Sequence, residues 1–449
     1  MPFQPSTRLS GESASKLGHL SVIKSDWVQS IISDFEDNKD NDEDTSGTCW
    51  LSFDSSVAQP LSSVWATDGS LASIKASGKP SKEISFVKTA LLTVDKARLD
   101  CIDKEQPHPL LLQDIMKDSA VLHATVFPLK NVKSSKDNNY HTVRHIINDS
   151  MKIDQNGAFY ETLKWLSFKK WDTPGQSSPA FSCPHCRHEV DGGIPFNADS
   201  CFCPDNSCGK EIFLTDMIGF HLDMGEESAP ESLVSSYMLI METLMLFTAI
   251  RLLWNHVDKS AISETLFIKD GPLTLRGQYS KLVPYIRDFL ENSKTINRPV
   301  HIIGQEKTGA FCNHLSTISK FTKPHEVEEP MHYSILSHGY VRKEVHRSPG
   351  LKSPYGKRTN WGEKAYIKID PTTELVLSIP TGRYDEDTNF PLSSDIIGLD
   401  RILATLPSLI SRKFEGALYP IALANGIASM SSYPSSKILQ NFVEESCKN

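Results

Sequence analysis

Two features that would place the chain outside the cell or in a membrane are missing from the sequence. The first residues, MPFQPSTRLS, lack the basic start and apolar run of a secretory signal. The most apolar stretch, Tyr237 to Trp254, approaches the ~20 residues that cross a bilayer, but it carries Glu242 and Arg251 in its interior. We therefore expect a cytoplasmic protein with no membrane partner, in which this stretch is a buried helix.

The chain also lacks an excess of basic residues and a nucleotide-binding loop. Its formal net charge is −8, from 47 Lys and Arg against 55 Asp and Glu. Nonspecific DNA affinity comes mainly from neutralised phosphates, so this charge counts against a DNA-binding protein that acts alone. The absence of a G-x-x-x-x-G-K-[ST] loop excludes a P-loop motor. Part of the acidity is local, in the run from Ser33 to Asp44, whose composition is typical of a solvated, disordered loop.

The remaining pattern predicts an α/β protein with a mixed sheet flanked by helices and one small inserted module. A boundary rich in Pro, Gly and Ser lies at Thr173 to Ala180. We expect an irregular, partly acidic N-terminal segment (1–61), two parts of a main domain (62–175 and 217–449), and the inserted module between them (176–216). Strands are predicted from Ser63 to about Asp68 and at Ile84 to Val94, Val121 to Pro128, Glu264 to Lys269, Pro299 to Gly304, Ala365 to Ile369 and Glu374 to Ile379. Helical patterns cover Asp26 to Phe35, Asp114 to Lys117, Tyr140 to Lys170 and Pro230 to Val257.

Cysteines are concentrated in the predicted insertion. Cys183 and Cys186 form one closely spaced pair, and Cys203 and Cys208 form a second pair followed by Gly209. Two such pairs can place four thiolates tetrahedrally around Zn²⁺, and four cysteine ligands leave no position for a reacting water, which favours a structural zinc. The spacing leaves alternatives open: Cys201 in place of Cys203, or His185 or His188 in place of one sulfur.

Three acidic residues stand in contexts that suit a metal site. Asp68 and Asp270 each end an apolar, β-prone segment and are followed by glycine, which lets a ligand approach the backbone closely. Glu242 lies inside a strongly apolar helix, where a buried charge needs a partner or a metal. Each residue alone has an ordinary structural explanation, as a turn aspartate or a helical glutamate. Together, three carboxylates would suit Mn²⁺ or Mg²⁺, and two such ions could support phosphodiester hydrolysis.

The order of these residues resembles the acidic motifs of the NurA nucleases. The resemblance rests on Asp68-Gly69-Ser70, on the helix around Glu242, and on the segment from Phe267 to Leu273 that contains Asp270. It extends to the segment Gly304 to Gly309, which includes Lys307, and to a closing motif at Tyr419, Pro420, Ala424 and Asn425. It spans about Val64 to Ala428.

The resemblance implies an RNase H-like fold and a manganese-dependent exo- and endonuclease that acts on DNA as a homodimer with a HerA-type hexameric ATPase. By the same resemblance, Asp68, Glu242 and Asp270 would be metal ligands and Lys307 would lie near the scissile phosphate. The zinc module, together with Ile212 to Asp216, resembles an insertion in a bacterial branch of the family, and we expect it to bind the ATPase or the sister subunit.

Two departures leave other functions open. The family often has a histidine where this chain has Asn425, whose amide can ligate a metal but cannot shuttle protons near neutral pH, and the interval from Glu242 to Asp270 is long. A catalytically altered adaptor subunit is therefore the alternative. A zinc-finger DNA-binding regulator is disfavoured by the acidic residues that flank the cysteines. The basic stretch from Arg342 to Lys368 is the better candidate for phosphate contacts, although a charged loop is the simpler explanation.

Overall fold

The computed structural model describes residues 24–33, 50–76, 78, 80–101, 111, 120–132, 138–225, 231–319, 331–347, 354–382, 391–411, 418–431 and 433–446. The chain divides into two units, Met1–Cys49 and Trp50–Asn449. In the first unit, α3 (Asp26–Ser33) confirms the helix predicted there. The acidic run after Ser33 and the helical pattern from Asp114 to Lys117 lie outside the described residues.

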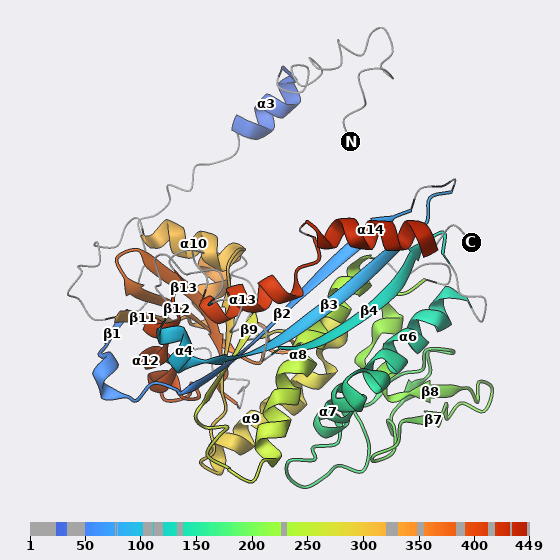
Figure 1. The fold of residues 1–449 in the computed structure, drawn as a ribbon, viewed down its shortest axis with the longest axis horizontal. Helices are drawn as coiled ribbons and strands as arrows, with labels where there is room; N and C mark the ends of the chain where they lie inside the picture. The colour runs from blue at the N-terminus through green and yellow to red at the C-terminus, as the bar shows by residue number, and fades with distance from the viewer. Residues whose placement is uncertain are drawn as a thin grey trace. The chain divides into compact units, whose positions relative to one another are not determined.

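The second unit is built on a nine-stranded mixed sheet, in the order β1-β11-β12-β13-β10-β9-β2-β3-β4 (Figure 1). β2, β9 and β10 run parallel to one another, and the other pairings are antiparallel. This confirms the α/β class and the mixed sheet. The strands are β1 (Leu51–Phe53), β2 (Ser63–Lys75), β3 (Glu83–Asp95), β4 (Ala120–Lys130), β9 (Thr265–Asp270), β10 (His301–Glu306), β11 (Met331–Ile335), β12 (Glu363–Asp370) and β13 (Thr373–Ile379).

Two strands differ from their predictions in ways that bear on the site. β2 does not end near Asp68 but continues to Lys75, because β3 pairs with it along its whole length. What ends near Asp68 is the pairing with β9, whose last partners are Thr67 and Lys269. β1 lies in the segment that was expected to be irregular, where it pairs with β11 at the edge of the sheet.

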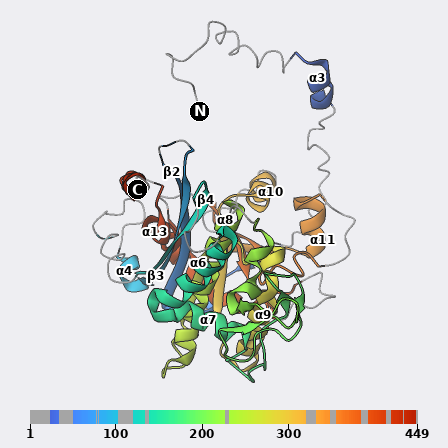
Figure 2. The ribbon, with the colours of Figure 1, turned by 90° about the vertical axis from the view of Figure 1, so that its right-hand side faces the viewer.

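Helices cover both faces of the sheet, and each face has its own apolar core. Figure 2 views the sheet nearly edge-on, with α13 on one side and α6, α8 and α9 on the other. Along β2 and β9, Val64, Leu266 and Ile268 pack in the core that contains residues of α12 and α13. Phe267, which points the other way, packs in the core formed with α6 to α9. Alternation along the strands therefore decides which helical layer each side chain meets.

The described helices are α4 (Lys96–Asp100), α6 (Asn139–Ile153), α7 (Ala158–Ser167), α8 (Glu231–Asn255), α9 (Val283–Thr295), α10 (Ala310–Ser319), α11 (His338–Tyr340), α12 (Leu399–Leu409), α13 (Tyr419–Ala428) and α14 (Ser435–Ser446). Short 3₁₀ segments are η3 (Ser55–Val57), η4 (Asp154–Gly157), η5 (Leu214–Ile218), η6 (Phe220–Leu222) and η7 (Gly277–Leu282), and η8 (Val341–Val345) is a π-helical turn. The helical pattern from Tyr140 to Lys170 is two helices rather than one, because Gln155, Asn156 and Gly157 adopt left-handed backbone angles.

Helix α8 is the predicted apolar helix. By length and composition it is the one helix among the described residues that could cross a membrane, but 83% of its most apolar window is buried inside the protein. Its apolar residues pack against the sheet and against neighbouring helices. Thr248 Oγ1, for example, lies 2.7 Å from Thr162 Oγ1 of α7. The structure thus supports a core helix, which explains why apolar residues occur on all of its sides.

Candidate functional site

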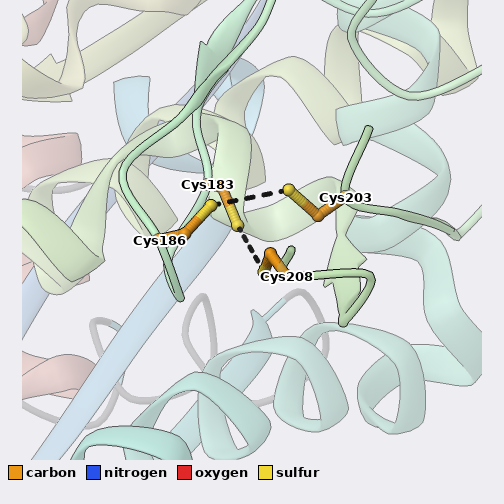
Figure 3. A group of neighbouring side chains, drawn as sticks. All are labelled: Cys183, Cys186, Cys203 and Cys208. Atoms are coloured by element: carbon orange, nitrogen blue, oxygen red, sulfur yellow. Dashed lines mark hydrogen bonds between the residues drawn. The ribbon is translucent and has the colours of Figure 1, made fainter. Parts of the chain in front are cut away.

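Four cysteines gather within the predicted insertion (Figure 3). Cys183 Sγ lies 4.0 Å from Cys208 Sγ, and Cys186 Sγ lies 3.6 Å from Cys203 Sγ. All four sulfurs lie within 4.8 Å of one another. Four sulfurs bonded tetrahedrally to one zinc ion at about 2.3 Å would be about 3.8 Å apart. The cluster therefore has the dimensions of a structural zinc site.

The cysteines are positioned by two similar turns, each following a short strand. Cys183 follows β5 (Phe181–Ser182), which pairs with β6 (Glu189–Val190), and Cys203 follows β7 (Ser200–Phe202), which pairs with β8 (Glu211–Phe213). In each turn the first cysteine's N–H donates across the hairpin, to His188 O at 2.8 Å and to Lys210 O at 2.9 Å. Positive φ angles at Arg187 (65°) and Gly209 (54°) then direct the chain back past the sulfurs.

The structure decides among the alternative ligands. Cys203 belongs to the cluster and Cys201 does not, because Cys201 lies within β7 opposite Ile212 and packs against the core. His185 and His188 are also outside the group, and His185 Nε2 lies 3.0 Å from Glu211 O instead. Burial raises the pKa of Cys203, and the neighbouring thiols raise it further. The Cys203 thiol is therefore poor at ionising without a cation to stabilise its thiolate.

The three candidate acidic residues come from separate elements that meet where β2 and β9 stop pairing. Asp68 lies in the middle of β2, Glu242 near the middle of α8, and Asp270 at the end of β9. Asp270 is therefore at a strand end, as predicted, and Gly271 follows with a φ of 77°. Asp68 is not at a strand end, but it is the first residue of β2 that no longer pairs with β9.

Asp68 is buried in an environment that disfavours its negative charge. The residue is 2% exposed, and its Oδ1 accepts a hydrogen bond of 2.7 Å from the N–H of Gly69. Burial raises its pKa to about 7, and the charges of Asp270 and Glu242 add to the shift. The side chain of Asn425 lowers the pKa by hydrogen bonding, yet within the described part of the chain no donor with normal geometry reaches Oδ2.

Glu242 is bound to a lysine that the sequence did not single out. Its Oε2 accepts a hydrogen bond of 2.7 Å from Lys269 Nζ, and the two side chains are 3% and 1% exposed. Burial still raises the pKa of Glu242, and the charge of Lys269 opposes that rise. Lys269 Nζ also donates to the carbonyl oxygen of Asp270 at 2.7 Å. The signal in the sequence was only a lysine at the end of an apolar strand, because the pairing with Glu242 depends on tertiary packing.

Asp270 also has a lysine partner. Lys307 Nζ lies 2.8 Å from Asp270 Oδ1, with both side chains about three-tenths exposed. The charges of Asp270 and Glu242 raise the pKa of Asp68, but the three carboxylates do not form a compact ligand set. Within the described residues, the grouping of three or more His, Cys, Asp or Glu ligand atoms within 4.8 Å is the four cysteines.

Strand alternation explains why the carboxylates are apart. Asp68 shares its direction with Val64 and Ala66, which pack in the core beneath α13, the helix that carries Asn425. Lys269 follows the direction of Phe267 toward α8, where it meets Glu242. Gly69, which follows Asp68, has no side chain, and the Glu242 carboxylate of α8 lies against its backbone. Glu242 therefore reaches β2 from α8 at Gly69, the residue next to Asp68.

Three of the basic residues in the stretch from Arg342 to Lys368 are buried. Arg342, Lys364 and Lys368 are at most 8% exposed. Lys364 is bound to Glu306, and Lys368 Nζ lies 3.5 Å from Glu374 Oε1. These three side chains belong to the packing of the sheet, whereas Lys343, Arg347 and Arg358 are exposed and stay candidates for phosphate contacts.

Comparison of the chain with models of known protein families and with curated proteins finds no match. The geometry of the two candidate sites, together with the motifs that resemble NurA, is therefore the basis for a functional proposal.

Proposed function

We propose that the chain is a metal-dependent nuclease of the NurA type, which hydrolyses phosphodiester bonds in DNA. The observation that carries the proposal is the convergence of Asp68, Glu242 and Asp270 from distant segments, close enough for the charges of Asp270 and Glu242 to raise the pKa of Asp68. Their order, on a first strand, a long helix and a later parallel strand, agrees with the family motifs. Three carboxylates within electrostatic reach of one another, two of them buried, would suit a divalent cation.

The arrangement of strands supports an RNase H-like core for this nuclease. Five neighbouring strands, β4-β3-β2-β9-β10, combine three antiparallel strands with two that are parallel to β2. This is the strand order expected of an RNase H-like sheet. The candidate acidic residues lie on its central strand, on the next strand, and on α8, the helix that precedes β9 in the chain.

The residues present fit a hard divalent cation. Asp68 offers a buried Oδ2 that accepts no hydrogen bond from the described residues, and Asp270 offers a partly exposed carboxylate. These two, with Glu242, would hold Mn²⁺ or Mg²⁺. Such ions, when bound, activate water and stabilise the leaving oxygen. Lys307, 30% exposed beside Asp270, is placed to contact a substrate phosphate.

The direct test is digestion of linear DNA by the purified protein in the presence of Mn²⁺. Asp68→Asn and Asp270→Asn should each abolish cleavage, because each removes a ligand charge. Asp258→Asn is the matched control, since Asp258 is a loop carboxylate that caps Ser260 through hydrogen bonds an asparagine can keep. Full cleavage by both site variants would refute the proposal.

We further propose that the four cysteines bind a structural Zn²⁺, and that the nuclease acts as a homodimer in the cytoplasm with a HerA-type hexameric ATPase. The net charge of −8 supports a partner that delivers DNA. Light scattering of the protein alone and mixed with such an ATPase would test the assembly. An ATPase gene beside this one would support the pairing, in DNA end processing or in defence against phage DNA.

A catalytically altered adaptor is the second candidate, and a specific observation favours it. Lys269 and Lys307 already neutralise Glu242 and Asp270, and an asparagine rather than a histidine approaches Asp68. Metal analysis separates the two candidates. Zinc at the cysteines without Mn²⁺ binding near Asp68 would favour the adaptor, whereas both metals would favour the nuclease.

A further inference from the structure

Glu242, one of the proposed metal ligands, forms a buried ion pair with Lys269. Lys269 Nζ lies 2.7 Å from Glu242 Oε2 and 2.7 Å from the carbonyl oxygen of Asp270. Both side chains are almost completely buried. A buried carboxylate with this partner is neutralised, and removal of either partner leaves an uncompensated charge in the core.

A second observation shows that the neighbouring carboxylate is not satisfied in the same way. Asp68, 2% exposed, has its Oδ2 buried without a hydrogen-bond donor among the described residues. One acidic residue of the site is therefore left without a counter-ion of its own while another is held by a lysine. Against burial, which raises both pKa values, Lys269 and Lys307 lower the pKa of Glu242, and Lys307 also lowers the pKa of Asp68.

We propose that Lys269 is a built-in counter-ion that competes with the divalent cation for Glu242, so that metal binding requires Lys269 to release the Glu242 carboxylate. This inference rests on the proposed metal-dependent function. Lys269 is a positioning residue in this account: it stabilises the metal-free protein and sets the metal concentration at which Glu242 becomes a ligand. The backbone oxygen of Asp270, which already accepts from Nζ, would retain the lysine after the exchange.

If Lys269 competes with the cation for Glu242, removal of Lys269 should raise the affinity for Mn²⁺ and lower the stability of the metal-free protein. Lys269→Met and Lys269→Gln both remove the competing charge, and the glutamine amide can still donate to Glu242. We expect the Mn²⁺ dissociation constant, measured by calorimetry, to fall by about tenfold or more in each variant, because a positive charge beside the cation is removed. The thermal midpoint of the metal-free variants should fall, and addition of Glu242→Gln to Lys269→Met should restore part of the loss.

The matched control is Lys164→Met. Lys164 is another largely buried lysine, which binds the carboxylate of Asp199 on the side of the protein that carries α7. Its replacement should lower stability without changing Mn²⁺ affinity. This control separates a general effect of losing a buried ammonium from an effect at the site.

Each outcome is decisive. If the wild type binds Mn²⁺ and both Lys269 variants bind it equally or more weakly, Lys269 does not compete with the cation for Glu242. The proposed nuclease function would still stand. No Mn²⁺ binding by the wild type or by any variant would overturn both. If Lys269→Met does not fold, Lys269→Gln supplies the affinity measurement. If the double substitution recovers no stability, Lys269 is not the counter-ion of Glu242.

Discussion

The carboxylate of Glu242 lies directly against the backbone of Gly69. A Cβ atom at position 69 would stand 2.6 Å from Glu242 Oε1 and 2.7 Å from Met238 Cγ. Because real Cβ atoms do not approach other atoms this closely, any side chain at position 69 displaces the carboxylate. Glycine is therefore required after Asp68 because α8 packs closely against β2 there, and not because the strand ends.

Gly69→Ala should accordingly impair the site. We expect nuclease activity to fall on the order of tenfold or more, since a displacement of Glu242 by about an ångström disturbs the site geometry. Gly277→Ala is the control, because a Cβ there meets no atom within 4 Å. Initial rates of DNA cleavage and urea unfolding of both variants would check this. Unchanged cleavage in Gly69→Ala would show that the position of Glu242 is not important for the reaction.

Asn425→His tests whether position 425 limits the chemistry. Asn425 is an exposed residue of α13 whose side chain interacts with Asp68. A histidine there could exchange a proton near neutral pH, so we expect the rate at saturating Mn²⁺ to rise on the order of tenfold or more. Asn441→His on α14, also exposed, should have no effect. A rate that stays the same would argue that no proton is transferred at this position.

Zinc content should follow the four clustered cysteines. Elemental analysis should find zinc in the wild type and in Cys201→Ser, and little in Cys203→Ser. Because Cys183 and Cys203 pack in the same core as α6, α7 and α8, zinc loss should lower the thermal midpoint by at least several degrees. Zinc retained in Cys203→Ser but lost from Cys201→Ser would reverse the ligand assignment.

His301 should make stability depend on pH. Burial lowers its pKa to about 4, from 6.5 in an unfolded chain. The unfolded chain binds a proton more readily than the native protein does. The contribution of neutral His301 to the free energy of unfolding is therefore fully present above about pH 6.5. As the pH falls toward 4 the free energy of unfolding decreases, by about 1.4 kcal/mol for each pH unit between these limits.

His301→Leu should flatten this dependence. The free energy of urea unfolding, measured between pH 4 and 7.5, should decline less steeply in the variant than in the wild type. His256→Gln, at an exposed position, should follow the wild-type curve. Parallel curves for His301→Leu and the wild type would mean that His301 is protonated equally in the native and unfolded states.

The elements of the fold were predictable where the apolar pattern is strong. The strands containing Leu266 and Ile302, and the helix around Glu242, follow from apolar runs that no surface element would carry. The full length of β2 was not predictable, because its second half pairs with β3 alone and contains exposed polar residues such as Ser73 and Lys75. β1 is too short for a pattern and depends on its pairing with β11.

The candidate sites show the same division. Spacing located the cysteine cluster, but Cys203 could be separated from Cys201 only when the register of β7 and β8 was known. Order along the chain identified Asp68, Glu242 and Asp270, whereas their partners depend on which face of the sheet each side chain meets. That choice is made by tertiary packing, which is why Lys269 was missed.

The position of Glu242 depends on how α8 is anchored on both sides of it. Tyr237 of α8 is anchored to His123 and Ser150, Thr248 is anchored to α7, and Glu242 lies between them. A slip of one turn would move the carboxylate about 5.4 Å along the helix axis. A substitution that loosens either anchor would therefore shift the carboxylate of Glu242, even though it lies outside the candidate site.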